Sequence, residues 1–273
     1  MTNHIMFRSL STRPWHRSYL STMSLPLLLL LLLLLASSTG SITSHSPSGA
    51  AASSSSSSAP ICSLEEWDKI STTRMQTTST DDDDVKVFID TYTKQNPGTR
   101  LLSFRGDAMG VPIHISDAIS HFENLTLSFD WIDLLKEARE ISNDVVYQVL
   151  RMPWPVSDRD LLLKKEWIFD NETKLVNVSY YSILDEEAER IVGPPKAGVI
   201  RAFNPLTRWI FRSSADHKGH TDISVESTVD SRGSIPSFVI NYFQRRWPSK
   251  ALGDFYNLVK ANKVSPRADL IDW

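Results

Sequence analysis

The second half of the chain alternates short apolar segments with turns, and this pattern limits the fold more than any other feature. Six segments are rich in β-branched and aromatic residues: 144–152, 160–169, 174–183, 197–203, 207–214 and 221–229. Asp170-Asn171-Glu172 forms a turn between two of them, and the polar segment 215–220 separates the last two. Short strands with few helices between them predict an antiparallel sheet.

The first half predicts two more strands and three helices. Residues 85–94 and 99–110 are expected to be strands, because Val85, Val87 and Ile89 alternate along one face. A capping box over residues 63–66 predicts the start of a helix that continues through Trp67 and Ile70. Residues 115–124 predict a short helix. An apolar stripe at helical spacing predicts an amphipathic helix over residues 127–142.

A long helix is expected to end the chain after Gly233, with Pro236 in its first turn. Its apolar face contains Val239, Tyr242, Phe243, Trp247, Leu252, Phe255, Leu258 and Val259. Pro248 is expected to kink this helix. The predicted fold class is α+β: a curved antiparallel sheet wrapped around a long C-terminal helix.

Composition excludes some classes of protein. Cys62 is the single cysteine, so the chain forms no internal disulfide and lacks the paired cysteines of common zinc sites. Residues 1–61 contain three arginines and no acid, which leaves 26 basic and 32 acidic residues in the rest. This acidic balance argues against a nucleic-acid partner, since phosphate binding needs clustered basic side chains.

The N-terminal segment is predicted to be a targeting region followed by a linker, over residues 1–62, with the folded domain over 63–273. Leu27–Leu35 is an unbroken run of nine leucines, too short to span a bilayer and typical of a signal peptide. The acid-free, Ser-rich stretch after it also resembles a transit peptide. We expect entry into the secretory pathway, ending outside the cell, in endomembranes or in a plastid. A mitochondrial location and an uncleaved membrane anchor are the alternatives.

The segment Met152–Leu163 contains the cluster Asp158-Arg159-Asp160 between two predicted strands. Adjacent residues of a strand point to opposite faces, so Arg159 and Asp160 are poorly placed to act together as a catalytic pair. We expect each to anchor the turn through a separate partner.

Two stretches of the sequence resemble START domains, the lipid-transfer modules related to steroidogenic acute regulatory protein. Residues 145–170 resemble the central signature, and residues 219–252 resemble the last strand, the Gly-x-Ile-Pro turn and the C-terminal helix. The resemblance covers roughly residues 63–261. It implies a helix-grip fold around a lipid-sized tunnel, with the C-terminal helix as a lid.

Candidate lipid-binding residues come from the alternation along residues 161–169, from the apolar face of the long helix, and from polar side chains on other strands that could reach the tunnel. They are Tyr147, Leu161, Leu163, Lys165, Trp167, Tyr181, Arg201, Phe238, Tyr242 and Phe243. The resemblance implies that Lys165 projects into the tunnel; the alternative is that its ammonium extends to an end of the sheet. Phe238, Tyr242 and Phe243 either contact ligand or pack in the core, and Arg201 either reaches the cavity or pairs at the surface.

The predicted function is binding of one lipid and its transfer between membranes, without catalysis, cofactor or metal. The ligand is a sterol, phospholipid or sphingolipid, the protein is a monomer, and Trp247, Arg245 and Arg246 contact the membrane transiently. His217 and His220 belong to a polar turn, because no further metal ligand is evident. One alternative is a polyketide-cyclase-like enzyme, with Asp107, His114 or Glu226 converging in the tunnel. A ligand sensor that does not transfer lipid is the other alternative.

Overall fold

The computed structural model describes residues 66–75, 86–99, 101–235 and 237–273, apart from the side chains of 237–239, 241 and 243. The chain divides into a unit over residues 1–55, outside the described part, and a unit over 56–273 that holds every described residue. The expectations for the targeting segment, Cys62 and Pro236 therefore lie outside the described residues, as do the side chains of Phe238 and Phe243.

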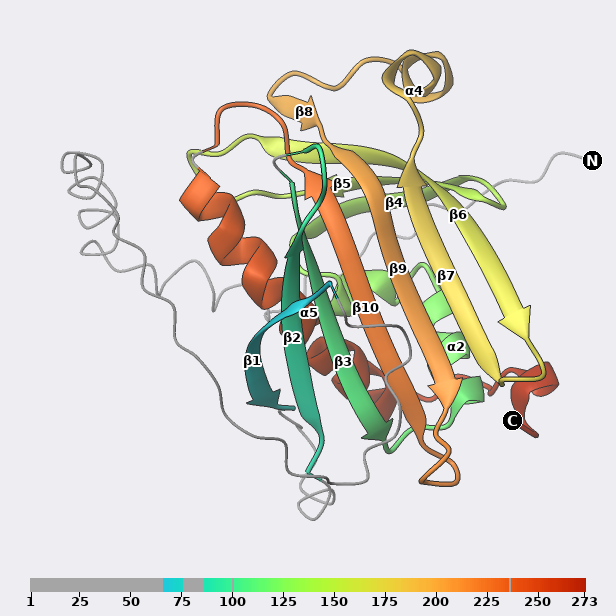
Figure 1. Cartoon of the computed structure of the whole chain (residues 1–273). Helices are drawn as coiled ribbons and strands as arrows, with labels where there is room; N and C mark the ends of the chain where they lie inside the picture. Colours follow the sequence, from blue (N-terminus) through green and yellow to red (C-terminus); the bar gives the residue numbers. More distant parts are fainter. Residues whose placement is uncertain (1–65, 76–85, 100, 236) are drawn as a thin grey trace, which may run out of the picture. The chain divides into compact units, whose positions relative to one another are not determined.

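Ten strands of the described chain form one sheet in the order β1-β2-β3-β10-β9-β7-β6-β5-β4, with β8 beside β6 (Figure 1). The strands are β1 (Asp68–Arg74), β2 (Phe88–Gln95), β3 (Leu102–Val111), β4 (Leu135–Ser142), β5 (Val145–Leu150), β6 (Asp158–Asp170), β7 (Leu175–Ser182), β8 (Val199–Arg201), β9 (Phe203–Ser213) and β10 (Thr221–Asp230). The helical elements are α2 (Ile115–Glu123), α3 (Ser128–Trp131), α4 (Asp185–Val192), α5 (Ser237–Ala261) and η3 (Ala268–Leu270).

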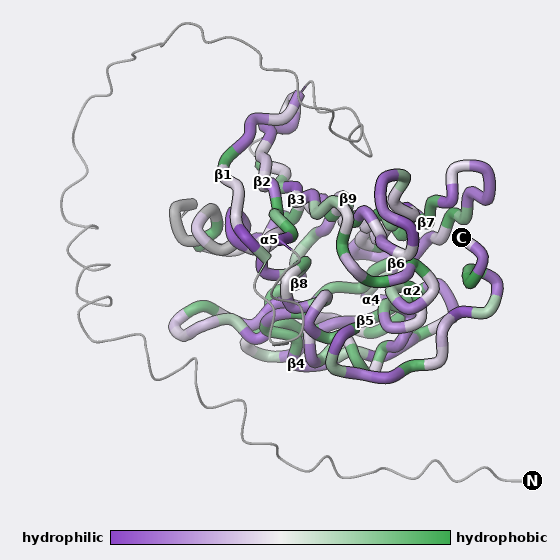
Figure 2. Tube along the Cα trace, turned by 90° about the horizontal axis from the view of Figure 1, so that it is seen from below, coloured by the Kyte–Doolittle hydropathy of each residue, from purple (hydrophilic) through white to green (hydrophobic). Residues whose placement is uncertain are grey.

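The sheet curves around α5. Figure 2 shows β1 and β2 on one side and β4 and β5 on the other, with α5 between them. We call the face that α5 packs against the concave face. Gly106 of β3 marks it, because a Cβ there would lie 2.9 Å from Pro248 Cβ and 3.0 Å from Leu252 Cδ1. The predicted fold, a curved sheet gripping a C-terminal helix, is confirmed.

An aromatic core fills the concave side next to α5. We use this name for Phe122, Trp131, Trp209, Phe211 and Phe255, which come from α2, α3, β9 and α5 and are all buried. The ring of Phe255 lies between 5.3 and 5.9 Å, centroid to centroid, from the rings of the other four. These contacts fix the C-terminal half of α5 on the sheet.

Two sequence predictions were wrong where helix-forming residues lie in edge strands. The segment expected to begin a helix at Ser63 contains β1 from Asp68 onward, paired with β2. The helix expected over residues 127–142 ends after one turn at Trp131, and residues 135–142 form the edge strand β4. Pairing with β5 outweighs the high helix propensity of its lysine, glutamate and alanine residues, and charged side chains suit an exposed sheet edge.

Helix α4 and the parallel pairing of β8 with β6 were not predicted. Three acids in the first turn of α4 favour its N-terminus, and Gly193 ends it with a φ of 81°. Ala188 is the buried residue of α4, and it packs in a small apolar cluster with Tyr147, Val149 and Leu162. The helix therefore covers part of the convex face, opposite α5.

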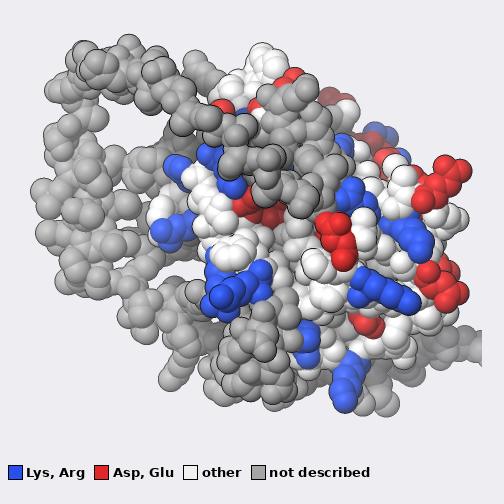
Figure 3. Space-filling model, turned by 60° about the horizontal axis from the view of Figure 1, so that its bottom comes forward, with Lys and Arg blue, Asp and Glu red and all other residues white. Residues whose placement is uncertain are grey.

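The described surface carries charges of both signs. Figure 3 shows acidic and basic side chains interspersed over much of the described part of the face turned to the viewer. Interspersed charges are typical of a solvated surface. Among the described helices, none is both long and apolar enough to cross a membrane.

Candidate functional site

Cross-strand pairing places four polar residues in one line on the concave face. Lys165 of β6 pairs with Tyr180 of β7, Tyr180 with Thr207 of β9, and Thr207 with Ser227 of β10. Ser227 pairs in turn with Phe104, which lies two residues from Gly106 and therefore shares its face. We call these four residues, Lys165, Tyr180, Thr207 and Ser227, the polar row.

Apolar residues border the polar row on both sides. Toward the C-terminal half of α5 the next line is Trp167, Val178, Trp209, Val225 and Gly106. Toward the other end, Leu161, Leu163 and Ala202 form a buried cluster with Leu150, and Tyr180 packs against both this cluster and the main core. The polar row therefore crosses a mostly apolar part of the concave face, on which Gln148, Ser182 and Thr91 also lie as the partners of Leu161, Leu163 and Gly106.

The side chains of the polar row are only partly covered, although they lie on the inner side of the sheet. Tyr180, Thr207 and Ser227 are half-buried, and the Lys165 side chain is 14% exposed. Thr207 Oγ1 and Ser227 Oγ share a hydrogen bond of 2.8 Å. Lys165 Nζ lies 3.9 Å from Glu140 Oε1, and the Glu140 side chain is 54% exposed. Burial raises the pKa of the Tyr180 phenol, so this hydroxyl stays protonated and can donate a hydrogen bond.

Four of the predicted site residues lie on the concave face. Leu161, Leu163, Lys165 and Trp167 alternate along β6 as expected, while Lys164, Glu166 and Ile168 between them are exposed. The Lys165 side chain starts from the concave face, and its ammonium lies near Glu140 of the edge strand β4.

Three other predicted residues lie on the convex face. Tyr147 pairs with Leu162, and Tyr181 pairs with Lys164. Leu162 and Lys164 point to the face opposite Lys165, so both tyrosines lie on the face opposite the polar row. Arg201 binds Asp160 through Nε at 3.2 Å and Nη2 at 2.7 Å. The site described here does not include these three residues. Tyr242 of α5 is 53% exposed, and its hydroxyl accepts from Arg246 at 2.9 Å.

Strand alternation alone could have indicated two members of the polar row that sequence reasoning missed. Tyr180 follows Val176 and Val178 at alternate positions of β7, and Thr207 precedes Trp209 and Phe211 in the same way on β9. Ser227 has no such signal, because its position next to Thr207 depends on the pairing of β9 with β10.

A buried network on the convex face contains Tyr147, Asp160 and Arg201. The Tyr147 hydroxyl donates to Asp160 Oδ2 at 3.2 Å, and the Asp160 carboxylate is fully buried. Burial, followed by the charge of Asp160, raises the pKa of Tyr147 to about 12. The Asp160 carboxylate accepts hydrogen bonds from both other groups beneath α4, so the role of the three is in stability.

Tyr147→Phe is therefore expected to lower stability and to leave ligand binding unchanged. The loss should be about 1.5–3 kcal/mol, because a buried carboxylate loses one hydrogen bond. Urea unfolding measures the first effect, and titration with a fluorescent lipid measures the second. Weakened lipid binding at unchanged stability would place Tyr147 in the ligand site instead.

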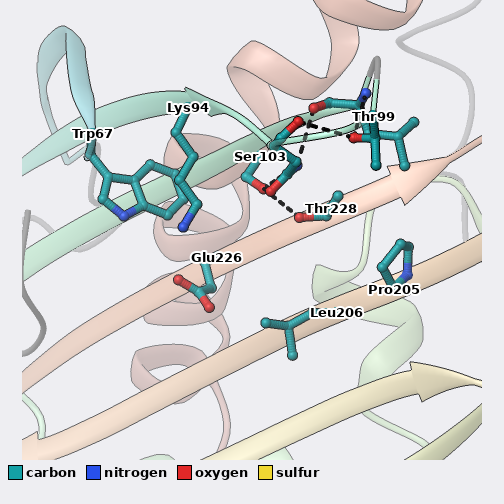
Figure 4. Close-up of a pocket in the computed structure, with 10 residues that line it drawn as sticks. Trp67, Lys94, Thr99, Ser103, Pro205, Leu206, Glu226 and Thr228 are labelled. Atoms are coloured by element: carbon teal, nitrogen blue, oxygen red, sulfur yellow. Dashed lines mark hydrogen bonds between the residues drawn. The ribbon is translucent and has the colours of Figure 1, made fainter.

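A separate pocket of about 270 Å³ lies on the convex face (Figure 4). Its walls are Trp67, Lys94, Asn96, Thr99, Leu101, Ser103, Pro205, Leu206, Glu226 and Thr228. The polar groups there already bind one another: Lys94 Nζ lies 4.7 Å from the Trp67 ring centroid, and Ser103 binds both Asn96 and Thr228. This pocket is therefore a surface hollow with satisfied polar groups.

The acid–base groups that the enzyme alternative requires lie on different surfaces. Asp107 binds Arg105 at 2.9 Å, and Glu226 lies 3.5 Å from Arg208, both on the convex face. His114 caps α2 by accepting from the backbone of Ser116. Among the described residues there is no group of three or more potential metal ligands, and His217 lies beside His220 in the β9–β10 turn.

Comparisons with known proteins give relatives that share this fold. The chain is 25% identical over 116 residues to START domain-containing protein 10 of Mus musculus and of Homo sapiens. The match covers 42% of this chain and 37% of each relative, so it spans little more than a third of their length. No family model matches the chain.

Solved structures of START-related proteins superpose on most of the chain. Human StAR-related lipid transfer protein 5 matches with a TM-score of 0.58 and 13% identity, over 73% of this chain and 88% of that one. Human STARD10 matches with a TM-score of 0.55 and 16% identity, over 71% and 73%. A STAR-related lipid transfer protein of Xanthomonas axonopodis matches with a TM-score of 0.52 and 18% identity, over 72% and 99%. The resemblance to START domains is confirmed, and the fold is their helix-grip fold.

Proposed function

We propose that this protein, which has the START fold, binds one lipid on the concave face of its sheet and transfers it between membranes. The observation that carries the proposal is the polar row with mostly apolar residues on both sides of it. A lipid has the complementary design, with long apolar chains and one polar group. Mostly apolar sites with a few converging polar groups bind such ligands. The lipid-transfer names of the structural relatives support the same function.

The chains of the lipid would lie against Leu161, Leu163 and Leu150, at the end of the concave face away from the aromatic core. Each buried methylene contributes about 0.8 kcal/mol. The polar group would meet Lys165 and the hydroxyl of Tyr180, which are cross-strand neighbours. This arrangement suits a sterol hydroxyl, a phospholipid phosphate or a sphingolipid headgroup.

Native mass spectrometry of the purified protein tests the proposal directly. We expect a lipid to be retained at one molecule per protein, and the same spectrum reports whether the protein is a monomer. An empty protein that also fails to take up lipid from vesicles would refute the proposed function. Transfer between donor and acceptor vesicles separates a transfer protein from a sensor, because a sensor binds lipid without delivering it.

Lys165→Met is expected to weaken lipid binding by about tenfold or more, since a hydrogen bond to a charged group contributes roughly 1.5–3 kcal/mol. Lys164→Met is the matched control, because Lys164 is the next residue of β6 and its side chain is 51% exposed on the convex face. Displacement of a nitrobenzoxadiazole-labelled phosphatidylcholine measures both affinities. Equal losses in the two variants would exclude a role for Lys165 in the site.

Arg245 and Arg246 are exposed on the first half of α5, and Arg246 stacks on the Tyr242 ring at 4.5 Å. We propose that they contact anionic headgroups, at about 1 kcal/mol for each charge. Trp247 is less suited to this contact, because it packs against the core with its ring 6.4 Å from Trp209. Replacing both arginines by glutamine should slow transfer between anionic vesicles by about tenfold and leave transfer between neutral vesicles unchanged. Unchanged rates on anionic vesicles would contradict this docking surface.

A further inference from the structure

Arg159 joins two loops that are far apart in sequence. Its Nε donates to Ser231 O at 2.6 Å and its Nη2 donates to Arg232 O at 2.9 Å. Its Nη1 donates to the carbonyl oxygen of Ser157. Ser157 ends the loop between β5 and β6, whereas Ser231 and Arg232 begin the loop between β10 and α5. One guanidinium group therefore holds both loops at once.

The side chain is buried, and its bonding is unusual for a buried charge. Arg159 is 3% exposed. Each of the three acceptors named above is a neutral carbonyl, and the acids beside Arg159 bind other cations. Asp158 binds Lys136 at 2.8 Å and Asp160 binds Arg201. Burying a charge without a carboxylate partner lowers stability. We therefore infer that Arg159 is used for the fixed geometry of its guanidinium donors, which can hold several backbone carbonyls in place.

The loop before α5 fits closely against this side chain. Arg232 and Gly233 both have positive φ, at 48° and 72°. A Cβ at Gly233 would lie 2.9 Å from Ile200 Cδ1 and 3.4 Å from Arg159 Nη2, so only glycine fits there without a shift. The side chain of Arg232 connects this loop to α4 as well, through an ion pair in which Nη1 lies 2.7 Å from Asp185 Oδ2.

The far end of α5 is fixed independently. Leu252, Phe255 and Tyr256 are buried in the core, and Pro248 contacts the sheet at Gly106. Pro248 also removes one backbone hydrogen bond from the middle of the helix. The first half of α5 therefore lies between the fixed C-terminal half of the helix and the loop that Arg159 holds. Pro248 between the two halves is a suitable hinge.

We propose that Arg159 is a positioning residue that couples the β5–β6 loop to the β10–α5 loop, so that the first half of α5 and the β5–β6 loop open together to exchange ligand. This inference rests on the proposed lipid binding at the concave face. The hydrogen bonds of Arg159 set how often the site opens, while the polar row sets how tightly a ligand is held. Arg159 itself does not touch the ligand in this scheme.

Hydrogen exchange of the ligand-free full chain, followed by mass spectrometry, tests the coupling without any lipid. In Arg159→Lys the charge remains but the fork of donors is lost. Backbone amides of residues 152–157 and of residues 231–247 should then both exchange about tenfold faster, as expected when a strong hydrogen bond is removed. Faster exchange in only one segment, or in neither, would overturn the coupling.

Arg201→Lys is the matched control, because Arg201 is a buried arginine of the neighbouring strand and binds Asp160 instead of the two loops. It should leave exchange in both segments unchanged. If Arg201→Lys and Arg159→Lys have the same urea midpoint and both accelerate hydrogen exchange equally, the effect is a general loss of stability, and the specific role of Arg159 is overturned. If Arg159→Lys does not fold, Gly233→Ala replaces it. The added Cβ would press on Ile200 and on the Arg159 guanidinium, and should therefore accelerate exchange in both segments.

A release assay then tests the consequence for ligand. The protein is loaded with nitrobenzoxadiazole-labelled phosphatidylcholine and mixed with unlabelled vesicles. Arg159→Lys should release the probe about tenfold faster, while the equilibrium affinity stays within a factor of about two, because opening accelerates entry and release alike. An unchanged release rate would overturn the gating role. If the wild type binds no lipid at all, the proposed function fails, and the exchange experiment still decides whether Arg159 couples the loops.

Discussion

Thr207→Trp is expected to weaken lipid binding strongly while the protein stays folded. Thr207 is the half-buried centre of the polar row, paired with Tyr180 on one side and Ser227 on the other. An indole placed there would occupy space that we assign to the lipid. Displacing three or four methylenes at about 0.8 kcal/mol each corresponds to roughly a hundredfold loss of affinity.

Arg208→Trp is the control for this experiment. Arg208 is the next residue of β9, and its side chain points to the convex face, where it lies 3.5 Å from Glu226. The same indole at this position should leave uptake within a factor of about two. Titration with labelled phosphatidylcholine gives both affinities, and circular dichroism confirms that each variant is folded. Full uptake by Thr207→Trp would show that lipid does not occupy this face.

Phe255→Ala is expected to have the largest effect on stability, a loss of about 3–5 kcal/mol. The Phe255 ring is fully buried and contacts the four other rings of the aromatic core, so its removal leaves a cavity between α5 and the sheet. Such a loss is a large part of the total stability of a domain of this size. Urea unfolding followed by tryptophan fluorescence measures it.

Tyr242→Ala on the same helix provides the comparison, because Tyr242 is 53% exposed. Its substitution should change the free energy of unfolding by less than about 0.5 kcal/mol. Similar losses for the two variants would mean that the C-terminal half of α5 is not the part of the helix that the sheet grips.

Local sequence patterns predicted most of the strands and the direction of their side chains. The alternation along β6 placed Leu161, Leu163, Lys165 and Trp167 on one face, and the structure agrees. The separate anchoring of Arg159 and Asp160 was also predicted, from the rule that adjacent strand residues point to opposite faces. These features depend only on neighbouring residues, which is why they can be read from a short stretch.

The predictions were wrong where local preference and tertiary pairing disagree. Residues 135–142 contain good helix formers, yet they form β4 because an edge strand gains backbone hydrogen bonds from β5. Tyr181 was predicted for the site, whereas the alternation along β7 places Tyr180 on the face of Val176 and Val178. A shift of one residue moves a side chain to the opposite face of a sheet, so this choice changed the predicted site.

The sequence by itself determined the strands, their inner and outer residues, and the long helix that the sheet surrounds, because the periods of 2 and 3.6 residues are local properties of the backbone. Only the tertiary structure decided which strands pair and in what register. That register brings Lys165, Tyr180, Thr207 and Ser227, from four strands, into one row. It also brings Ser231 and Arg232 within hydrogen-bond distance of Arg159, more than seventy residues earlier in the chain. Contacts between such distant residues depend on the packing of the whole sheet, and no local pattern encodes them.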